Sequence, residues 1–356
     1  MPLPAADPPA APHRGRAIPK GPIPPGALEP ALLTVCPEPD IRRDLMRVMM
    51  RDFVASWDVR ENIPAGPRVF ITNHQSASDI THFCGWLAGL TGCRVEILMW
   101  DGHFDLDAAG VSRAFFTFPE TGERSVSKIL RPRPIDQSNP RDVIGTWRSM
   151  ISNTANGDDC LAVVCARGET ETYEGEPLTV MSAAILDEIL RANLPITPVR
   201  FNWGAPDTPG RRNMWSVDFA PQHVASGASL SPAALLQIPR GKQREAVLDG
   251  VNALTVPRPA AHLAAAAPRA NRIRALAEET GMGLTKAAFC DGLFTTAPET
   301  LTEDGRLFVE LATVPRAGDR HGAHTFMGKF ARWLSDGYGP SRIPLKARYP
   351  LLDGAP

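Results

Sequence analysis

The chain has 356 residues, 43% of them hydrophobic and 22% charged, so it is long enough to bury a core without disulfide support. Its 38 basic and 39 acidic residues leave a formal charge of -1, which argues against a globally basic nucleic-acid-binding protein and against an acidic disordered chain. Six cysteines stand at irregular spacings without a CxxC pair, so neither a structural zinc site nor any other metal is expected.

The sequence also lacks the signals of export and membrane insertion. The first residues contain no apolar signal segment, and no stretch approaches the ~18 consecutive apolar residues of a membrane-spanning helix. We therefore expect a cytoplasmic protein with reduced cysteines, either soluble or peripheral on the inner face of the membrane.

Residues 1–38 are expected to form a flexible, Pro-rich arm. Ten of the 35 prolines fall within residues 1–30, and proline removes the backbone donors on which helices and sheets depend. The segment is therefore expected to be extended and poorly ordered.

Residues 39–256 alternate between the periodicities of helices and strands. The predicted helices cover residues 40–54, 80–90, 141–151, 181–192 and 241–254. The predicted strands cover residues 68–72, 94–99, 134–136, 160–165, 196–201 and 217–220. This alternation indicates an α/β domain with a central, mostly parallel sheet covered by helices.

The composition changes after residue 256, and residues 257–356 are expected to form a partly helical, basic extension. A helix is predicted over residues 271–280, with Asn271 as its N-cap, and a strand over residues 307–311. Eight basic residues stand against three acidic ones between Arg306 and Arg348. This segment either touches anionic lipid headgroups or the phosphates of a nucleotide-bearing ligand, or is simply solvated.

The most informative residues lie between Asn73 and Asp79, where a predicted strand meets a predicted helix. Loops at strand ends are common places for catalytic groups. His74 and Asp79 form a dyad if the turn folds back, because the carboxylate can hold one ring nitrogen while the other takes a proton from a hydroxyl. The alternative is that Asp79 only caps the helix and His74 is a polar residue at a strand end.

Several segments resemble the motifs of the phospholipid and glycerol acyltransferase superfamily, the lysophosphatidate-acyltransferase-like enzymes. Asn73, His74, Ser76 and Asp79 match its first motif, N-H-x-S-x-x-D. The segment 194–200 resembles its fourth motif, V-P-I-x-P-V, while the segments 134–137 and 163–168 stand where its second and third motifs lie. The matching segments all fall between residues 45 and 255.

The resemblance implies transfer of a fatty acyl group from acyl-CoA or acyl-carrier protein to a hydroxyl of a lysophospholipid or related lipid. His74 would be the general base and Asp79 its orienting partner. Asn73 and Ser76 would belong to the same site, with Ser76 as a helix-cap hydroxyl, and backbone donors near Gly168 would stabilise the oxyanion. The acyl donor is a co-substrate, and no cofactor is implied.

The second and third motifs, with which the family grips the acceptor phosphate, depart from the family pattern. Gln137 stands at the position of the second-motif arginine, although Arg133 and Arg131 lie four and six residues before it. Arg167 replaces the third-motif glutamate, and Glu169 follows Gly168. Either Arg167 binds an anion while Glu169 restores the carboxylate, or the acceptor is not a glycerol phosphate.

Acceptor-binding roles are accordingly expected for Arg131, Arg133, Gln137, Arg167, Gly168 and Glu169. Two other functions remain open at this point. One is a non-catalytic relative that binds acyl-CoA or lipid, and the other is a metal-dependent hydrolase that uses His74, Asp79 and His82. No nucleic-acid partner is expected.

Overall fold

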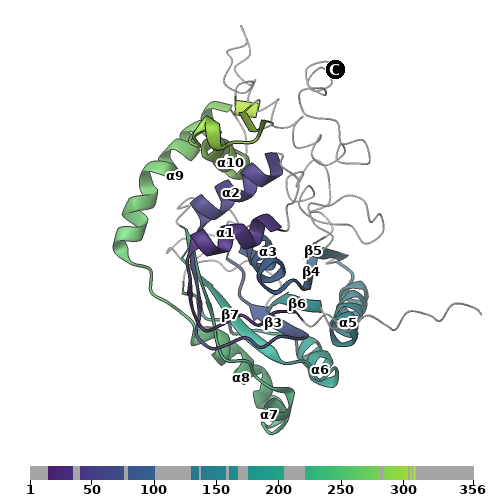
Figure 1. Ribbon diagram of the computed structural model, residues 1–356. Coiled ribbons are helices and arrows are strands. Elements are labelled where there is room, and N and C mark those ends of the chain that lie inside the picture. Colours follow the sequence, from purple (N-terminus) through teal and green to yellow (C-terminus); the bar gives the residue numbers. More distant parts are fainter. Residues whose placement is uncertain are drawn as a thin grey trace, which may run out of the picture.

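A mixed, mostly parallel sheet forms the centre of the computed structural model (Figure 1). The structure describes residues 15–34, 41–75, 79–100, 130–135, 138–157, 160–166, 175–203, 221–280 and 284–303, with 305, 306, 308 and 309. Within these residues the strands are β1 (Gly21–Ile23), β2 (Val54–Val59), β3 (Arg68–Thr72), β4 (Arg94–Trp100), β5 (Leu130–Ile135), β6 (Cys160–Cys165), β7 (Ile196–Asn202) and β8 (Gln222–Ser226).

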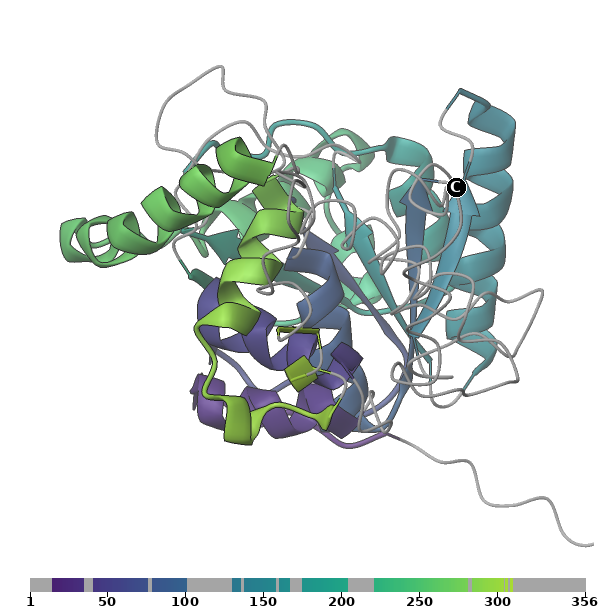
Figure 2. The ribbon, with the colours of Figure 1, turned by 90° about the horizontal axis from the view of Figure 1, so that it is seen from above.

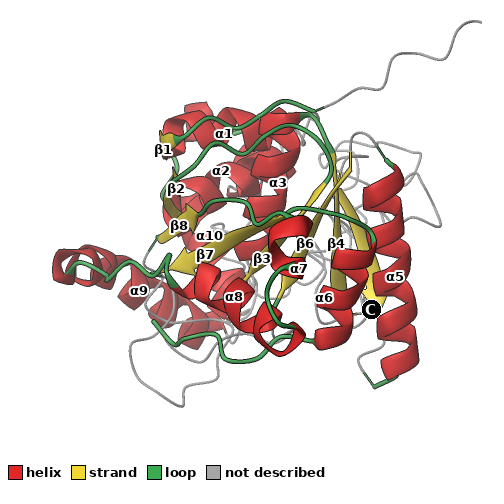
Figure 3. Cartoon of the chain, turned by 90° about the horizontal axis from the view of Figure 1, so that it is seen from below, coloured by secondary structure: helices red, strands yellow, loops and turns green. Residues whose placement is uncertain are grey.

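The described strands follow the order β1-β2-β8-β7-β3-β6-β4-β5, which Figure 3 shows from β1 to β4. The pairs β1–β2 and β7–β8 are antiparallel, and the other neighbours are parallel. Every residue of β3 is buried, as a central strand requires. Because β3, β6 and β7 run in parallel, their carboxyl ends meet at one edge of the sheet.

Helices cover both faces of the sheet, as the alternating sequence predicts (Figure 1). One face carries α1 (Pro25–Thr34), α2 (Ile41–Phe53), α3 (Asp79–Thr91) and α10 (Leu284–Phe294). The other face carries α5 (Pro140–Asn156), α6 (Ala183–Arg191), α7 (Pro232–Leu236) and α8 (Arg240–Asn252). The long helix α9 (Ala260–Thr280) lies on the opposite side of the molecule from α5 (Figure 2).

Alternate side chains of the central strands enter two separate cores. In β3, Phe70 joins the core beneath α1, α2 and α3, whereas Val69 and Ile71 join the core beneath α5, α6 and α8. The first core contains a group of aromatic rings in which Phe83 makes edge-to-face contacts with Trp57, Phe70 and Phe201. The α/β architecture is thereby confirmed.

The prediction of a flexible arm is wrong for residues 15–34. This stretch forms β1 and α1, and it places Ile18, Leu28 and Leu32 in the first core. Pro25 occupies the first position of α1, where its missing N–H removes no helical hydrogen bond. Burial of the apolar side chains therefore outweighs the high proline content, while residues 1–14 and 35–38 lie outside the described ones.

Other predicted boundaries are also corrected. Val54 begins β2 instead of ending the preceding helix. Helix α9 starts at Ala260, so Asn271 lies inside it and is no N-cap. The predicted strand over residues 307–311 is wrong where it can be tested, because residues 308 and 309 are helical. The predicted strand over residues 217–220 lies outside the described residues.

The helices that follow residue 256 share a core with the preceding domain. Ala287, Ala288, Cys290 and Leu293 of α10 belong to the same buried cluster as Trp57. In the described part of the chain, no helix combines the length and apolarity that a membrane crossing requires.

Candidate active site

His74 and Asp79 meet at the carboxyl end of β3, as the sequence predicts. The imidazole Nδ1 lies 2.8 Å from Asp79 Oδ1. An ionised carboxylate can only accept, so Nδ1 carries the proton and donates it to this bond. The ring nitrogen that can act as a base is then Nε2. The imidazole is 19% exposed and the carboxylate 0%, so a substrate can reach the histidine but not the aspartate.

Backbone donors hold the Asp79 carboxylate in place. Its Oδ2 accepts from Gln75 N at 2.7 Å, and its Oδ1 accepts from Ile80 N at 2.6 Å. Asp79 is the first residue of α3, where the helix dipole favours a negative charge. The helix-cap interpretation and the dyad interpretation are therefore compatible, since one carboxylate serves both.

Asn73 fastens the dyad segment to the neighbouring strand β7. Its side-chain Nδ2 donates to Phe201 O at 2.9 Å, and Phe201 N donates to its Oδ1 at 2.7 Å. Asn73 is 1% exposed. The structure thus places its amide against the backbone of β7, where it orients the residue before His74.

The end of β6 lies beside the end of β3 at the same edge of the sheet. Thr72 pairs in register with Cys165, and Thr72 Oγ1 is 3.8 Å from Cys165 Sγ. Cys84 of α3 is fully buried, and burial raises the pKa of its thiol, with smaller contributions from Cys165 and Asp79. The thiols of Cys84 and Cys165 are thus electrostatic neighbours close to the dyad.

The predicted acceptor-site residues are only partly described. Arg133 donates to Glu96, with Nη2 2.8 Å from Oε1 and Nε 3.4 Å from Oε2, and Glu96 is 2% exposed. Arg131 lies on β5 opposite Glu96 in register. The residues outside the described part of the chain are Ser76, Gln137, Arg167, Gly168 and Glu169.

His82 does not join the dyad as a third polar ligand. It is fully buried in the first core, where its ring contacts Trp86 at 4.8 Å and Phe201 at 6.1 Å. Among the described residues, no three His, Cys, Asp or Glu side chains are grouped so that they could hold a metal ion. The metal-dependent interpretation of His74, Asp79 and His82 therefore has no support in this part of the structure.

Sequence reasoning missed a polar clamp next to the site. Arg200 of β7 is buried, and it donates to Glu176 O at 2.7 Å and to Asn252 Oδ1 at 3.0 Å. The Asn252 amide also bonds both backbone groups of Leu178, at 2.8 and 2.9 Å. A charged residue inside an apolar strand was the available signal. The clamp fixes residues 176–178 to β7 and α8.

A second polar cluster, also missed, lies at the start of β8. Ser56 Oγ is 2.7 Å from His223 Nδ1, and the His223 ring stacks on Trp203 at 4.7 Å. Trp203 has a positive φ of 61°, and its ring also lies 4.9 Å from the ring of His262. The cluster joins β2, β7, β8 and the start of α9.

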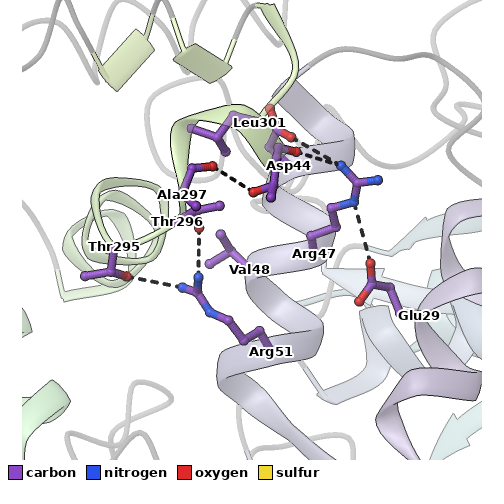
Figure 4. Close-up of a pocket in the computed structure, with 10 residues that line it drawn as sticks. Glu29, Asp44, Arg47, Val48, Arg51, Thr295, Thr296, Ala297 and Leu301 are labelled. Atoms are coloured by element: carbon purple, nitrogen blue, oxygen red, sulfur yellow. Dashed lines mark hydrogen bonds and ion pairs between the residues drawn. The ribbon is translucent and has the colours of Figure 1, made fainter.

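A pocket of about 530 Å³ lies elsewhere, between α1, α2 and the residues that follow α10. Figure 4 shows Arg51 directed at Thr295 and Thr296, and Arg47 directed at Glu29. The charged groups that line this pocket bond to one another or to its walls. We therefore interpret it as the joint between the amino-terminal and carboxyl-terminal helices.

Neither the scan against protein-family models nor the search of curated proteins finds a match to this chain.

Proposed function

We propose that this protein is an O-acyltransferase in which His74 is the general base. The observation that carries the proposal is the His74–Asp79 hydrogen bond of 2.8 Å, in which the carboxylate is buried and the imidazole is accessible. The resemblance of residues 73–79 to the first acyltransferase motif supports the same assignment, and so does the position of the dyad at a carboxyl edge of parallel strands.

The proposed reaction needs only the residues of the chain and the two substrates. His74 Nε2 takes the proton of the acceptor hydroxyl as the oxygen attacks the thioester carbonyl of acyl-CoA or acyl-carrier protein. The carbon–sulfur bond then breaks, and the thiolate recovers the proton from the imidazolium. Asp79 fixes the tautomer of the neutral imidazole and stabilises the imidazolium that forms, and two backbone N–H groups hold the Asp79 carboxylate in place.

The proposed acceptor is a lysophospholipid or a related hydroxyl-bearing lipid, met at the membrane surface. Among the described residues, Arg133 is a cation that would favour an anionic acceptor, and it forms an ion pair with Glu96. Arg131, Gln137, Arg167, Gly168 and Glu169 stay as predicted contributors to this site. A cytoplasmic location and a role in phospholipid biosynthesis belong to the same proposal.

The decisive experiment follows both products of the reaction. The protein is incubated with labelled acyl-CoA and a panel of lysophospholipids and simple alcohols, while thiol release and acylated product are measured separately. His74→Ala should slow both by roughly 10²–10⁴-fold, the usual contribution of a general base. The matched control is His262→Asn, whose ring bonds Pro221 O and lies outside the dyad.

Each alternative function predicts a different result. A non-catalytic relative would bind acyl-CoA without releasing thiol, and His74→Ala would leave that binding intact. A hydrolase would release free fatty acid in place of an acylated acceptor. Wild-type turnover in a folded His74→Ala variant would refute the proposed role of His74.

A further inference from the structure

Arg68, the first residue of β3, is a buried cation without an acidic partner among the described residues. Arg68 is 3% exposed, although guanidinium groups are almost never buried unless they are paired. No carboxylate of the described chain forms an ion pair with it, and burial lowers its pKa to about 10, opposed only by Cys93. At neutral pH the guanidinium group therefore remains charged, and no carboxylate of the described residues balances it.

The polar neighbours of Arg68 are two hydroxyl groups. Its Nη1 donates to Ser229 Oγ at 3.1 Å and to Thr197 Oγ1 at 3.4 Å, and the two hydroxyl oxygens lie 2.8 Å apart. One hydroxyl donates to the other, so one hydroxyl hydrogen of the pair is left to donate elsewhere. One guanidinium group and two hydroxyl groups thus converge at a point where no carboxylate of the described residues lies.

The nitrogens of Arg68 also differ in their surroundings. Nε is sealed from solvent and has no hydrogen-bond partner within the described chain, while Nη1 is bonded to the hydroxyls. Nη2 is neither bonded to the described residues nor among the sealed atoms, so it is the nitrogen through which the charge meets the surface. Nη2 belongs to the same guanidinium group as Nη1, which bonds both hydroxyls, so an ion bound at Nη2 would lie on the cation that these hydroxyls hold.

We propose that Arg68, Thr197 and Ser229 form a binding site for a small inorganic anion, either chloride or an oxyanion such as sulfate or phosphate. The near-complete burial of Arg68 favours a small ion over a phosphate ester that carries an organic group. The site lies at the amino end of β3, whereas His74 follows its carboxyl end, so the proposal does not depend on the proposed acyl transfer.

The predicted effect is anion-dependent stability, because a ligand that binds only the folded state raises the melting temperature. Wild type and Arg68→Met are melted from a low-salt buffer into which chloride, sulfate and phosphate are titrated separately. At low salt the methionine variant should match or exceed the wild type, since a buried uncompensated charge has been removed. Added anion should then raise the melting temperature of the wild type relative to Arg68→Met, by roughly 3 °C at fifty times the dissociation constant.

Two further variants make the result specific. Ser229→Ala keeps the charge and should weaken the anion response, while Arg148→Met removes an exposed arginine and should retain the wild-type response. A difference between wild type and Arg68→Met that stays constant for all three anions would overturn the proposal. The proposal also fails if Arg148→Met loses the response as fully as Arg68→Met, because the effect would then be general screening.

Discussion

At the scale of single residues, the dyad combines an accessible base with an inaccessible carboxylate. The sequence predicts this pair because the five-residue spacing crosses a strand–helix junction, and the structure brings the two side chains to 2.8 Å. The spacing does not reveal that Asn73 is committed to the backbone of Phe201. That bond depends on which strand lies beside β3, and a local motif carries no such information.

Replacing Asp79 with asparagine should impair proton transfer by His74 without impairing binding of the acyl donor. The amide can donate to Nδ1, which would move the ring proton to Nε2 and block the base. We expect kcat to fall by roughly 10²–10⁴-fold while binding of the acyl donor is retained. Thiol release measures the first quantity and calorimetric titration the second. Asp249→Asn, an exposed carboxylate on α8, is the control, and an equal loss in that variant would contradict the assignment.

His223 should make stability depend on pH. Burial lowers its pKa below the ordinary value near 6.5, with Asp58 raising it and Arg60 lowering it further. As the pH falls through 6.5, the unfolded chain takes up a proton that the folded chain still refuses, so stability is lost on acidification. Urea unfolding at pH 5 to 8 should show a steeper acid loss in the wild type than in His223→Gln. Identical pH profiles would contradict this.

At the scale of elements, the high proline content of residues 1–30 explains why composition predicts a flexible arm where α1 forms. Its apolar residues Leu28, Ala31 and Leu32 recur at helical spacing, and they are buried where α1 crosses α3. The close approach of these helices depends on Gly89, because a Cβ at this position would lie 1.9 Å from Ala31 O. The described strands and helices between residues 68 and 201 were predictable, since each repeats its pattern locally, except that β5 begins at Leu130 and not at the predicted residue 134.

Gly89→Ala should therefore destabilise the fold by pushing α1 away from α3. Overpacking of this kind costs about 1–3 kcal/mol. The matched control is Gly145→Ala in α5, where an added Cβ meets nothing within 4 Å. That change should be neutral or stabilising by up to ~1 kcal/mol, because alanine favours the helix. Urea unfolding measures the free energy of unfolding of both variants. Equal values for Gly89→Ala and Gly145→Ala would contradict the packing argument.

At the scale of the whole molecule, the order of the strands and the docking of the last helices were not predictable. Strand β2 pairs with β8, more than 160 residues later, and Arg51 of α2 bonds Gly292 O at the end of α10. Such contacts join segments whose local patterns are independent of each other. The expected extension after residue 256 instead contributes helices to the core that contains β2 and β3.

A network of charges links α2, α9 and α10. Asp291 of α10 accepts from Arg272 Nε at 2.9 Å and Nη2 at 3.2 Å, and it lies 3.9 Å from Arg269. Arg269 in turn lies 3.6 Å from Asp52, which Arg51 binds through two nitrogens. Burial lowers the pKa of Arg269, and both carboxylates oppose that shift. Removing the Asp291 carboxylate should therefore leave the desolvated charge of Arg269 less well balanced, with Asp52 as its remaining ion-pair partner among the described residues.

Asp291→Asn should weaken the whole fold and not only its carboxyl-terminal helices. Because α10 packs in the common core, we expect a single unfolding transition whose free energy falls by about 1–3 kcal/mol. Asp187→Asn removes a partner of the exposed Arg240 and should change it by less than ~1 kcal/mol. Circular dichroism and tryptophan fluorescence, followed together in urea, test both statements. An early separate transition in Asp291→Asn would show that α9 and α10 unfold independently, and the shared core would then contribute little to their stability.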